Sequence, residues 1–386
     1  MNTSRYLIVG GGMSGDAAVQ GMRAHDPDGT ITLVGEEPHA PYKRPPLTKG
    51  LWKGGDEEKI WKGTADKGAD VVVGRRIVAL DLAAKRATDD AGEEYGFEKL
   101  LLATGGRPRR LPDADDSVLY FRTLDDYRAL RAAAERDGAR VVVIGGGFIG
   151  SELAAALVGA GAQVTMVFPE PGIGFRIFPA HLAAFVTEYY REHGIEVLAE
   201  ETVESVAAGR VTLGSGRVLD ADVVVAGLGI EPRVELAEAA GLPIDNGIVV
   251  DEYGRVEGHE DVFACGDVAS FPAPALGRRL RVEHEDHANS HGKAVGANMA
   301  GAGEPYDHLP FFYSDLFDLG YEAVGELDSR LSTVEHWDEP NRKGVVAYVD
   351  DERRPRGYLL WNVWDTVDAA TERIRASEPV EEDALV

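Results

Sequence analysis

The hydrophobic pattern of the chain begins with a short strand that runs directly into glycines. Residues 6–9 are apolar, residues 10–15 form a glycine-rich turn, and a helix pattern starts at Asp16. A second apolar strand, residues 31–35, ends at Glu36. In such a unit the backbone N–H groups of the turn and the helix N-terminus can bind a pyrophosphate. An acid about 20 residues past the last glycine is placed to bind a ribose diol, so the pattern predicts a dinucleotide site.

The same pattern occurs a second time. A strand over residues 140–144 leads into the glycine turn 145–150, a helix pattern follows, and the strand 164–168 precedes Glu170. One glycine motif alone is weak evidence, but two complete strand–turn–helix–strand–acid units indicate two dinucleotide sites. The alternative is a pair of glycine-rich turns in an unrelated α/β sheet.

Three later segments also have the pattern of strands that end in glycine. They cover residues 99–106, 223–229 and 262–267. Ligands of open α/β sheets bind beyond the carboxyl ends of such strands. Because Gly266 and Asp267 come after the second unit, we expect that unit to be inserted into the first.

Beyond Pro305 the pattern changes to short strands separated by turns, followed by a helix at about 365–375. The acidic tail, residues 378–386, is expected to be loose. The predicted fold class is α/β, with two Rossmann-like dinucleotide-binding domains, the second inserted in the first, and a C-terminal α+β domain. The predicted boundaries are 1–123 with 233–306, 124–232, and 307–386.

Composition narrows the classes of function. The net charge of −26 among 386 residues disfavours nucleic acid and anionic membrane partners, and is otherwise explained as a solubilising surface. Cys265 is the only cysteine, which excludes disulfide scaffolds and paired-thiol redox centres. We see neither a signal peptide pattern nor an apolar run long enough to cross a bilayer, so the expected compartment is the cytoplasm.

Further motifs carry a resemblance to a known family. Residues 41–49, 277–288, 312–316 and 320–325, together with the two glycine turns, resemble the two-dinucleotide flavoprotein disulfide-reductase superfamily. Within it the chain is most similar to the branch of ferredoxin reductases and apoptosis-inducing factor. His284 stands where ferredoxin reductases tend to carry tryptophan, which favours the apoptosis-inducing-factor type. Tyr313 replaces a usual tryptophan, Glu285 replaces a second histidine, and the long insertion of the animal proteins is missing, so we expect a prokaryotic redox protein.

The resemblance implies the cofactors FAD and NADH and a set of binding residues. FAD is expected in the first predicted domain and NADH in the second, with Glu36 and Glu170 on the two riboses. Lys49 is expected to pair with Glu152 beside the flavin, and Glu283 and His284 to lie near the nicotinamide. The expected cofactor-binding residues are Gly10, Gly12, Met13, Ser14, Gly15, Glu36, Arg44, Lys49, Ala103, Thr104, Gly105, Gly145, Gly147, Phe148, Ile149, Glu152, Glu170, Gly229, Gly266, Asp267, Glu283, His284, His287, Tyr313 and Glu322.

The expected catalytic residues are Lys49, Glu152, Phe148 and His284. Hydride transfer to a flavin needs stacking and exclusion of water, and Phe148 could cover the ring until nicotinamide displaces it. Packing between turn and helix is the other role open to Phe148. Lys49 and Glu152 could hold the flavin loop, or be two unrelated surface charges.

Several other residues keep two interpretations. Glu170 favours NADH over NADPH, although Arg176 could soften that preference, and Glu170 could also be a solvated loop acid. His287, near the start of a helix predicted to run to about residue 300, suits capping or core packing as well as catalysis, and a metal site is not expected. Cys265 is interpreted as small core filling.

Two functions follow. The first is an NADH oxidoreductase similar to apoptosis-inducing factor, in which reduced flavin and NAD⁺ stay together as a charge-transfer complex and the protein forms a homodimer. The alternative is an NADH-dependent reductase that passes electrons to a ferredoxin or a quinone. Two arginine clusters could dock an acidic ferredoxin or form only local salt bridges; they are Arg107, Arg109 and Arg110, and Arg278, Arg279 and Arg281.

Overall fold

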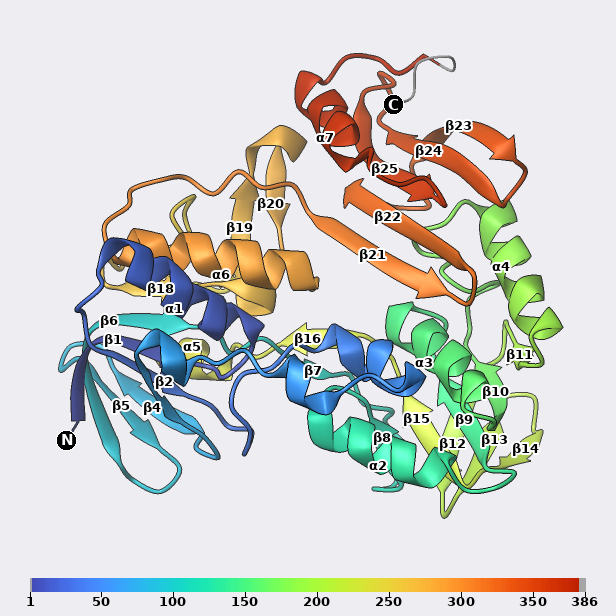
Figure 1. The fold of residues 1–386 in the computed structure, drawn as a ribbon, viewed down its shortest axis with the longest axis horizontal. Helices are drawn as coiled ribbons and strands as arrows, with labels where there is room; N and C mark the ends of the chain where they lie inside the picture. The colour runs from blue at the N-terminus through green and yellow to red at the C-terminus, as the bar shows by residue number, and fades with distance from the viewer. Residues whose placement is uncertain (1, 382–386) are drawn as a thin grey trace. The chain divides into compact units, whose positions relative to one another are not determined.

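The computed structural model describes residues 2–381, which group into two compact units (Figure 1). The first unit comprises Met1–Lys43, Glu57–Arg107 and Glu231–Pro310. The second comprises Arg44–Asp56, Pro108–Ile230 and Phe311–Val386. Two short paired strands, β7 (Gly106–Pro108) and β16 (Ile230–Pro232), lie where the chain passes from one unit to the other. The three predicted domains and their boundaries stay a prediction.

Within the described residues, a seven-stranded sheet forms the centre of the first unit. Its strand order is β3-β2-β1-β6-β5-β4, and β18 pairs with β6. Its bounds are β1 Asn2–Val9, β2 Ile31–Val34, β3 Ala69–Val72, β4 Ile77–Asp81, β5 Arg86–Asp89, β6 Glu94–Leu102 and β18 Val262–Ala264. The same unit contains α1 Met13–His25, α5 Glu235–Ala239, α6 Glu285–Met299, β17 Ile248–Val249, β19 Ala269–Ala273 and β20 Arg278–Leu280.

Strand β18 shows how the two Rossmann-like parts are connected. Its residues Val262 and Ala264 pair in parallel with Leu100 and Leu102 of β6. The chain therefore returns to the first sheet after it has built the second, which confirms the predicted insertion. The pairing also places the turn at Gly266 at the carboxyl end of the same parallel sheet as β1 and β2.

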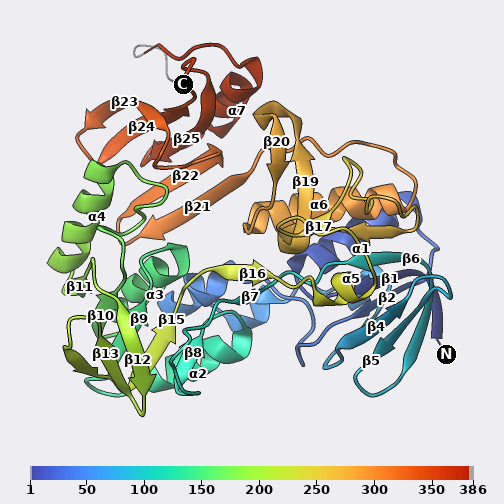
Figure 2. The same ribbon diagram turned by 180° about the vertical axis from the view of Figure 1, so that it is seen from behind.

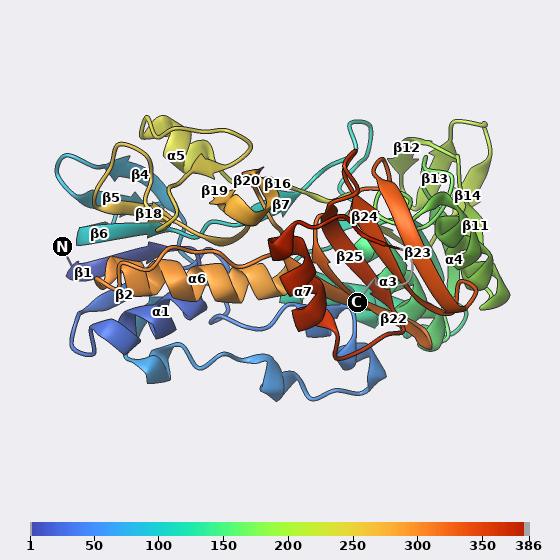
Figure 3. The same ribbon diagram turned by 90° about the horizontal axis from the view of Figure 1, so that it is seen from above.

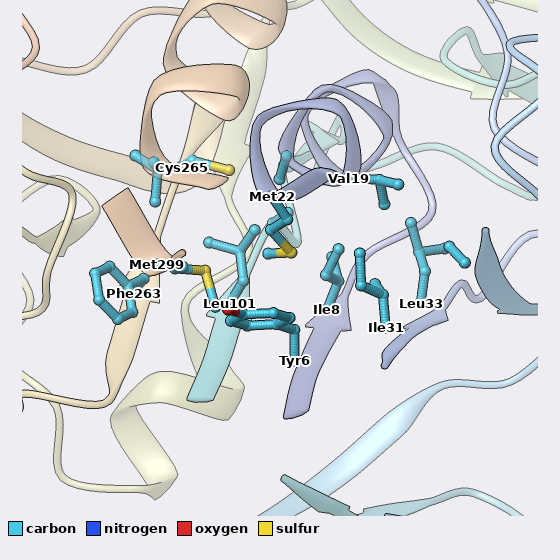
Figure 4. Close-up of a cluster of buried hydrophobic side chains, with 14 residues drawn as sticks. Tyr6, Ile8, Val19, Met22, Ile31, Leu33, Leu101, Phe263, Cys265 and Met299 are labelled. Carbon is cyan, nitrogen blue, oxygen red and sulfur yellow. The ribbon is translucent and has the colours of Figure 1, made fainter. Parts of the chain in front are cut away.

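A continuous apolar core lies between this sheet and its helices (Figure 4). Tyr6 and Ile8 of β1 pack with Met22 of α1 and Met299 of α6, all of them buried. Cys265 belongs to the same cluster and has no exposed surface. Burial raises the pKa of its thiol, so the side chain is an inert apolar filler, as predicted.

Helices α1 and α6 run side by side and touch through their backbones (Figures 1 and 3). A Cβ added at Gly21 would lie 2.0 Å from the carbonyl oxygen of Lys293. A Cβ added at Gly296 would lie 2.1 Å from the carbonyl oxygen of Ala18. Only glycine permits this approach, which holds α1 closely against the C-terminal half of α6.

The second unit contains a five-stranded parallel sheet of order β11-β10-β9-β15-β8 (Figure 2). Its bounds are β8 Val118–Tyr120, β9 Arg140–Ile144, β10 Gln163–Val167, β11 Glu196–Leu198 and β15 Val223–Ala226. The helices of this part are α2 Leu124–Ala134, α3 Phe148–Gly159 and α4 Ala180–Glu192. A small antiparallel sheet adds β12 Val203–Ala207, β13 Arg210–Leu213 and β14 Val218–Asp220.

The C-terminal part of the second unit is an antiparallel sheet of order β21-β22-β25-β24-β23. Its bounds are β21 Phe311–Leu316, β22 Leu319–Gly325, β23 Ser332–Glu339, β24 Lys343–Val349 and β25 Pro355–Trp361, and α7 Val367–Ala376 follows. Trp361 stacks on Tyr321 at 5.6 Å and meets Phe178 edge-on at 5.3 Å. These aromatic contacts attach the sheet to the segment that precedes α4, and the predicted strands and final helix are confirmed.

The acidic tail differs from the prediction at its start. Val380 is 4% exposed, and its N–H donates a hydrogen bond to the carbonyl oxygen of Arg353 at 2.9 Å. The Arg353 guanidinium in turn donates to the carbonyl oxygen of Val380 at 2.8 Å. One buried apolar side chain therefore anchors a segment whose acidity suggested a loose tail. The rest of that prediction, residues 382–386, lies outside the described residues.

A single methyl group should disturb the contact between α1 and α6. We expect Gly296→Ala to lower the free energy of unfolding by about 1–3 kcal/mol, because the backbones must separate to admit it. Gly159→Ala in α3 is the matched control, because its Cβ would meet no described atom within 4 Å. That change should stabilise the protein by about 0.5–1 kcal/mol. Urea unfolding midpoints measure both, and equal midpoints would contradict the proposed role of the contact.

Candidate functional site

The first glycine turn leaves the N-terminus of α1 open. Gly10 has a φ of +126°, and a Cβ there would lie 2.1 Å from the carbonyl oxygen of Ala103. Gly12 caps the helix without a side-chain hydrogen bond, and no described atom lies within 4 Å of its Cβ position. Unpaired helix N–H groups beside open space suit a pyrophosphate, so this turn fits the dinucleotide expected there.

The acid expected to bind the first ribose has a protein partner. Glu36 pairs with the guanidinium of Arg233, and 44% of its side chain is exposed. Arg233 is held in place because its carbonyl oxygen accepts a hydrogen bond from Thr104 Oγ1 at 2.9 Å. Sequence reasoning missed Arg233, since nothing in its local pattern links it to Glu36. The ion pair fixes the carboxylate and leaves part of it accessible.

The turn after β18 is packed directly on the first glycine turn. Gly266 has a φ of +71°, and a Cβ there would lie 2.1 Å from Ser14 Oγ. The N–H of Gly266 donates to His291 Nδ1 at 3.3 Å. Asp267 is 8% exposed, and its carbonyl oxygen accepts from Arg281 Nη1 at 3.2 Å. The structure thus brings Ser14, Gly266 and Asp267 together, as expected for residues that share one ligand.

The two histidines at the start of α6 both have lowered pKa values. His284, the N-cap residue, is half-buried, and burial lowers its pKa to about 4. Burial also lowers the pKa of His287 to about 3. His287 stacks on Phe271 at 4.7 Å, and its Nδ1 lies 3.2 Å from the hydroxyl of Tyr306. His287 is therefore a core residue in this structure, while the predicted cofactor roles of both histidines stay predictions.

The second glycine turn repeats the geometry of the first. Gly145 has a φ of +119°, and a Cβ there would lie 2.4 Å from the carbonyl oxygen of Gly227. Gly147 caps α3 without a side-chain bond, and its Cβ position is open among the described atoms. Phe148 is half-buried and meets Phe312 edge-on at 5.3 Å, and Ile149 is 36% exposed. The turn fits a second dinucleotide, with an aromatic ring at its rim.

Glu170 is paired by the arginine that follows it. Arg176 Nε and Nη2 donate to Glu170 Oε1 at 3.0 and 2.8 Å. The arginine side chain is 84% exposed, while that of the glutamate is 23% exposed. Both guanidinium contacts use one carboxylate oxygen, so Oε2 stays available to accept from a ribose hydroxyl.

Lys49 and Glu152 are paired, as expected. Lys49 Nζ lies 3.1 Å from Glu152 Oε1, and their side chains are 15% and 8% exposed. The alternative of two unrelated surface charges is therefore wrong. Lys49 Nζ also lies 4.4 Å from the centroid of the Tyr313 ring, within the range of a cation–π contact.

The loop that carries Lys49 is held inside the second unit. It consists of two short 3₁₀ turns, Pro45–Leu47 and Gly50–Lys53. Arg44 Nη1 donates to the carbonyl oxygen of Arg122 at 2.8 Å, and Arg131 Nη1 donates to that of Leu51 at 2.6 Å. These bonds give the loop a fixed backbone from which Lys49 can approach Glu152.

Glu322 lies opposite Tyr313 in the ladder between β21 and β22. Burial, with a further contribution from Asp365, raises the pKa of its carboxyl. Its Oε2 is buried and has no hydrogen-bond partner among the described residues. An unsatisfied buried acceptor fits a residue that meets a bound ligand.

The arginine clusters form local ion pairs. Arg107 pairs with Glu231 at 2.6 Å and also with Glu235. Arg281 pairs with Glu283 at 2.6 Å. These contacts favour the local salt-bridge interpretation over a basic docking patch.

The described residues show neither a metal site nor a membrane-spanning helix. Across residues 2–381, no group of three or more His, Cys, Asp and Glu side chains is arranged to hold a metal ion. No helix in that range is both long and apolar enough to cross a membrane.

The two dinucleotide turns and the C-terminal sheet define an FAD-dependent NAD(P)H oxidoreductase. The chain belongs to the pyridine nucleotide-disulphide oxidoreductase family, whose pattern matches residues 4–292. The pattern of the C-terminal domain of mitochondrion-associated apoptosis-inducing factor matches residues 295–343. The family resemblance seen in the motifs is confirmed, while a prokaryotic origin stays a prediction.

Individual relatives cover nearly the whole chain. The chain is 32% identical to apoptosis-inducing factor 1 of Dictyostelium discoideum, over 98% of this chain and 79% of that protein. It is 35% identical to the ferredoxin–NAD⁺ reductase component of the anthranilate 1,2-dioxygenase system of Burkholderia cepacia, over 97% and 95%. A chain of the covalent putidaredoxin reductase–putidaredoxin complex matches with a TM-score of 0.92 and 29% identity, over 100% and 96%.

Acid should destabilise the first unit through its buried histidines. The folded-state pKa of His287, about 3, is below its ordinary value of 6.5, so the unfolded chain binds more protons between these values. Its contribution to stability is complete above pH 6.5 and is lost as the pH falls toward 3. We expect His287→Gln to reduce the slope of unfolding free energy between about pH 6 and pH 4 by about 1 kcal/mol per pH unit.

Urea unfolding at a series of pH values measures that slope. The matched control is His25→Gln, which changes an exposed histidine of the same unit and should keep the slope of the unaltered protein. A His287→Gln variant with an unaltered slope would show that this imidazole is not the source of the acid sensitivity.

Proposed function

We propose that this enzyme transfers hydride from NADH to FAD without a redox-active disulfide. The observation that carries the proposal is the state of Cys265, the only cysteine, which is buried with a raised thiol pKa. Thiol–disulfide exchange needs a thiolate and a partner sulfur. Neither is supplied here, so electrons must leave from the flavin itself.

The residues of the chain bind and orient the two cofactors in this proposal. Bound FAD supplies the ring that accepts hydride and passes electrons on. Gly10, Gly12 and the N-terminus of α1 hold its pyrophosphate, and Asp267 holds its sugar chain. Gly147 and α3 would hold the NADH pyrophosphate, and Phe148, at the rim of the same turn, would help to exclude water from the stacked rings.

We further propose that the oxidised nicotinamide stays bound after transfer as a charge-transfer complex, and that the reduced protein dimerises. Similarity to apoptosis-inducing factor in both the whole chain and the C-terminal domain supports this proposal. His284 supports it as well, because this N-cap residue of α6 stands where ferredoxin reductases tend to carry tryptophan. The helix N-terminus favours the negative charge of a reduced ring.

A ferredoxin reductase is the second candidate. The similarity to the ferredoxin–NAD⁺ reductase component of Burkholderia cepacia and to the putidaredoxin reductase complex favours a ferredoxin as the electron acceptor. The charge of −26 opposes an acidic ferredoxin, and the paired arginines Arg107 and Arg281 do not offset it.

Anaerobic reduction separates the two candidates. We expect NADH to bleach the flavin of the purified holoenzyme, to leave a stable long-wavelength absorption band, and to shift the protein to a dimer on gel filtration. A band that persists would show that the oxidised nicotinamide stays beside the reduced flavin. Fast reoxidation by a ferredoxin, with no band and no change in elution volume, would support the second candidate instead.

Glu170 should select the nicotinamide cofactor. Its free Oε2 can accept from a ribose hydroxyl and repels a 2′-phosphate, so we propose a preference for NADH over NADPH. Glu170→Ala should reduce the ratio of kcat/KM for NADH to that for NADPH by about tenfold, since the repulsion is lost and Arg176 becomes available to the phosphate.

Arg176→Leu is the companion variant, because it leaves Glu170 unpaired and should make the enzyme more strict for NADH. Stopped-flow reduction of the flavin by each nucleotide gives the ratios. If both variants keep the unaltered ratio, the carboxylate does not contact the cofactor ribose.

A further inference from the structure

We infer that Thr48 and Ser314 are positioning residues that keep Lys49 available to the flavin by occupying Glu152. The inference rests on the proposed function, together with the place beside the flavin that the family resemblance implies for Lys49. The three segments that meet at Glu152 all belong to the second unit: the loop before the 3₁₀ turn Gly50–Lys53, helix α3 and strand β21. No role in binding or catalysis was expected for either hydroxyl.

The two hydroxyls occupy both oxygens of the carboxylate. Thr48 Oγ1 donates to Glu152 Oε2 at 2.6 Å, and Ser314 Oγ donates to Oε1 at 2.6 Å. The Thr48 hydroxyl also lies 3.3 Å from the carbonyl oxygen of Pro45, but its single hydrogen goes to the nearer, charged acceptor. A carboxylate that is 8% exposed is costly to bury without such donors.

Lys49 is close to this carboxylate without a hydrogen bond to it. Its Nζ is 3.1 Å from Glu152 Oε1, yet among the described residues the buried ammonium has no hydrogen-bond partner. The ring of Tyr313, 4.4 Å away, attracts the charge but accepts no strong hydrogen bond. The ammonium is therefore held by charge while its N–H donors are unused, which fits an acceptor atom on a bound ligand.

Ser314 decides where those donors point. Its hydroxyl occupies Oε1, the oxygen nearest to Lys49. A carboxylate oxygen has two acceptor positions, so this hydroxyl fills one of those on Oε1. Without it Oε1 carries more unsatisfied negative charge in a buried site, and the ammonium is drawn more strongly toward it. Thr48 acts on Lys49 through the other oxygen, Oε2. Loss of its hydrogen bond leaves more negative charge on the whole carboxylate, which attracts the ammonium more strongly.

The equilibrium between oxidised and reduced flavin should depend on where the Lys49 ammonium points. A donor and positive charge beside the ring favour its reduced, more negative form, so a Lys49 turned toward Glu152 disfavours reduction. In Ser314→Ala and in Thr48→Val, we expect the equilibrium of the purified holoenzyme against a reference redox dye to shift about tenfold toward oxidised flavin. For a two-electron couple this corresponds to about 30 mV.

Matched variants separate positioning from general damage. Ser314→Thr and Thr48→Ser keep the hydroxyls and should keep the unaltered equilibrium. On strand β23 of the same sheet, Thr333 Oγ1 donates to Glu335 Oε1 at 2.8 Å. Thr333→Val removes this hydroxyl and should leave the flavin equilibrium unchanged. Equal shifts in the alanine and threonine variants of Ser314 would overturn the inference.

A double-mutant cycle tests the route through Lys49. In a Lys49→Met background, Ser314→Ala should cause no further shift, because the ammonium that it redirects is gone. An undiminished shift there would overturn the inference even if each single variant behaved as expected. If Ser314→Ala does not fold, the Thr48→Val and Lys49→Met pair completes the same cycle.

The failure of the inference is distinguishable from the failure of the proposed function. A purified protein that holds no FAD, or whose FAD is not reduced by NADH, contradicts the proposed function before any variant is made. A flavoprotein that NADH reduces, but whose equilibrium is the same in Ser314→Ala and Thr48→Val, contradicts only the role of the two hydroxyls.

Discussion

The buried carboxylate of Glu152 requires hydrogen-bond donors and a counter-charge from the surrounding chain. Without them, a buried charge costs several kcal/mol, which is comparable with the whole stability of a domain. Thr48 and Lys49 supply them from one loop and Ser314 from a distant strand. The charge therefore joins the loop and the C-terminal sheet to α3, the helix that follows the second glycine turn. Local order at that turn and the direction of the Lys49 ammonium have the same physical cause.

The first unit uses a similar device around Asp16, which has no exposed surface in the first turn of α1. Its carboxylate accepts from Thr64 Oγ1 and Lys67 Nζ, each at 2.6 Å. The opposite side of α1 meets α6 through glycines such as Gly296, where no side chain separates the backbones. Charge pairing on one side and close backbone packing on the other keep the N-terminus of α1 rigid and open, as a phosphate-binding turn requires.

Much of the fold could be predicted because its signals are local. Two strand–glycine–helix units, the strand patterns after Pro305 and the buried Cys265 all follow from neighbouring residues. Residues that act through distant partners could not be found in this way. Arg233 meets Glu36 across the sequence, and Val380 is held by Arg353, although both segments have ordinary polar patterns. The family motifs contained Lys49 and Glu152, but only the geometry revealed the hydroxyls between them.

Charge shows the same limit of sequence reasoning. An arginine cluster in an acidic chain suggests a docking patch, because opposite charges steer association. In the structure Arg107 meets two glutamates, and Arg279 lies 3.6 Å from a carboxylate oxygen of Glu257. A partner approaching the protein senses the field left after such pairing, and for these arginines little positive charge is left. Recognition of an acidic redox protein would therefore need to open existing ion pairs, whereas a small uncharged acceptor would meet no such barrier.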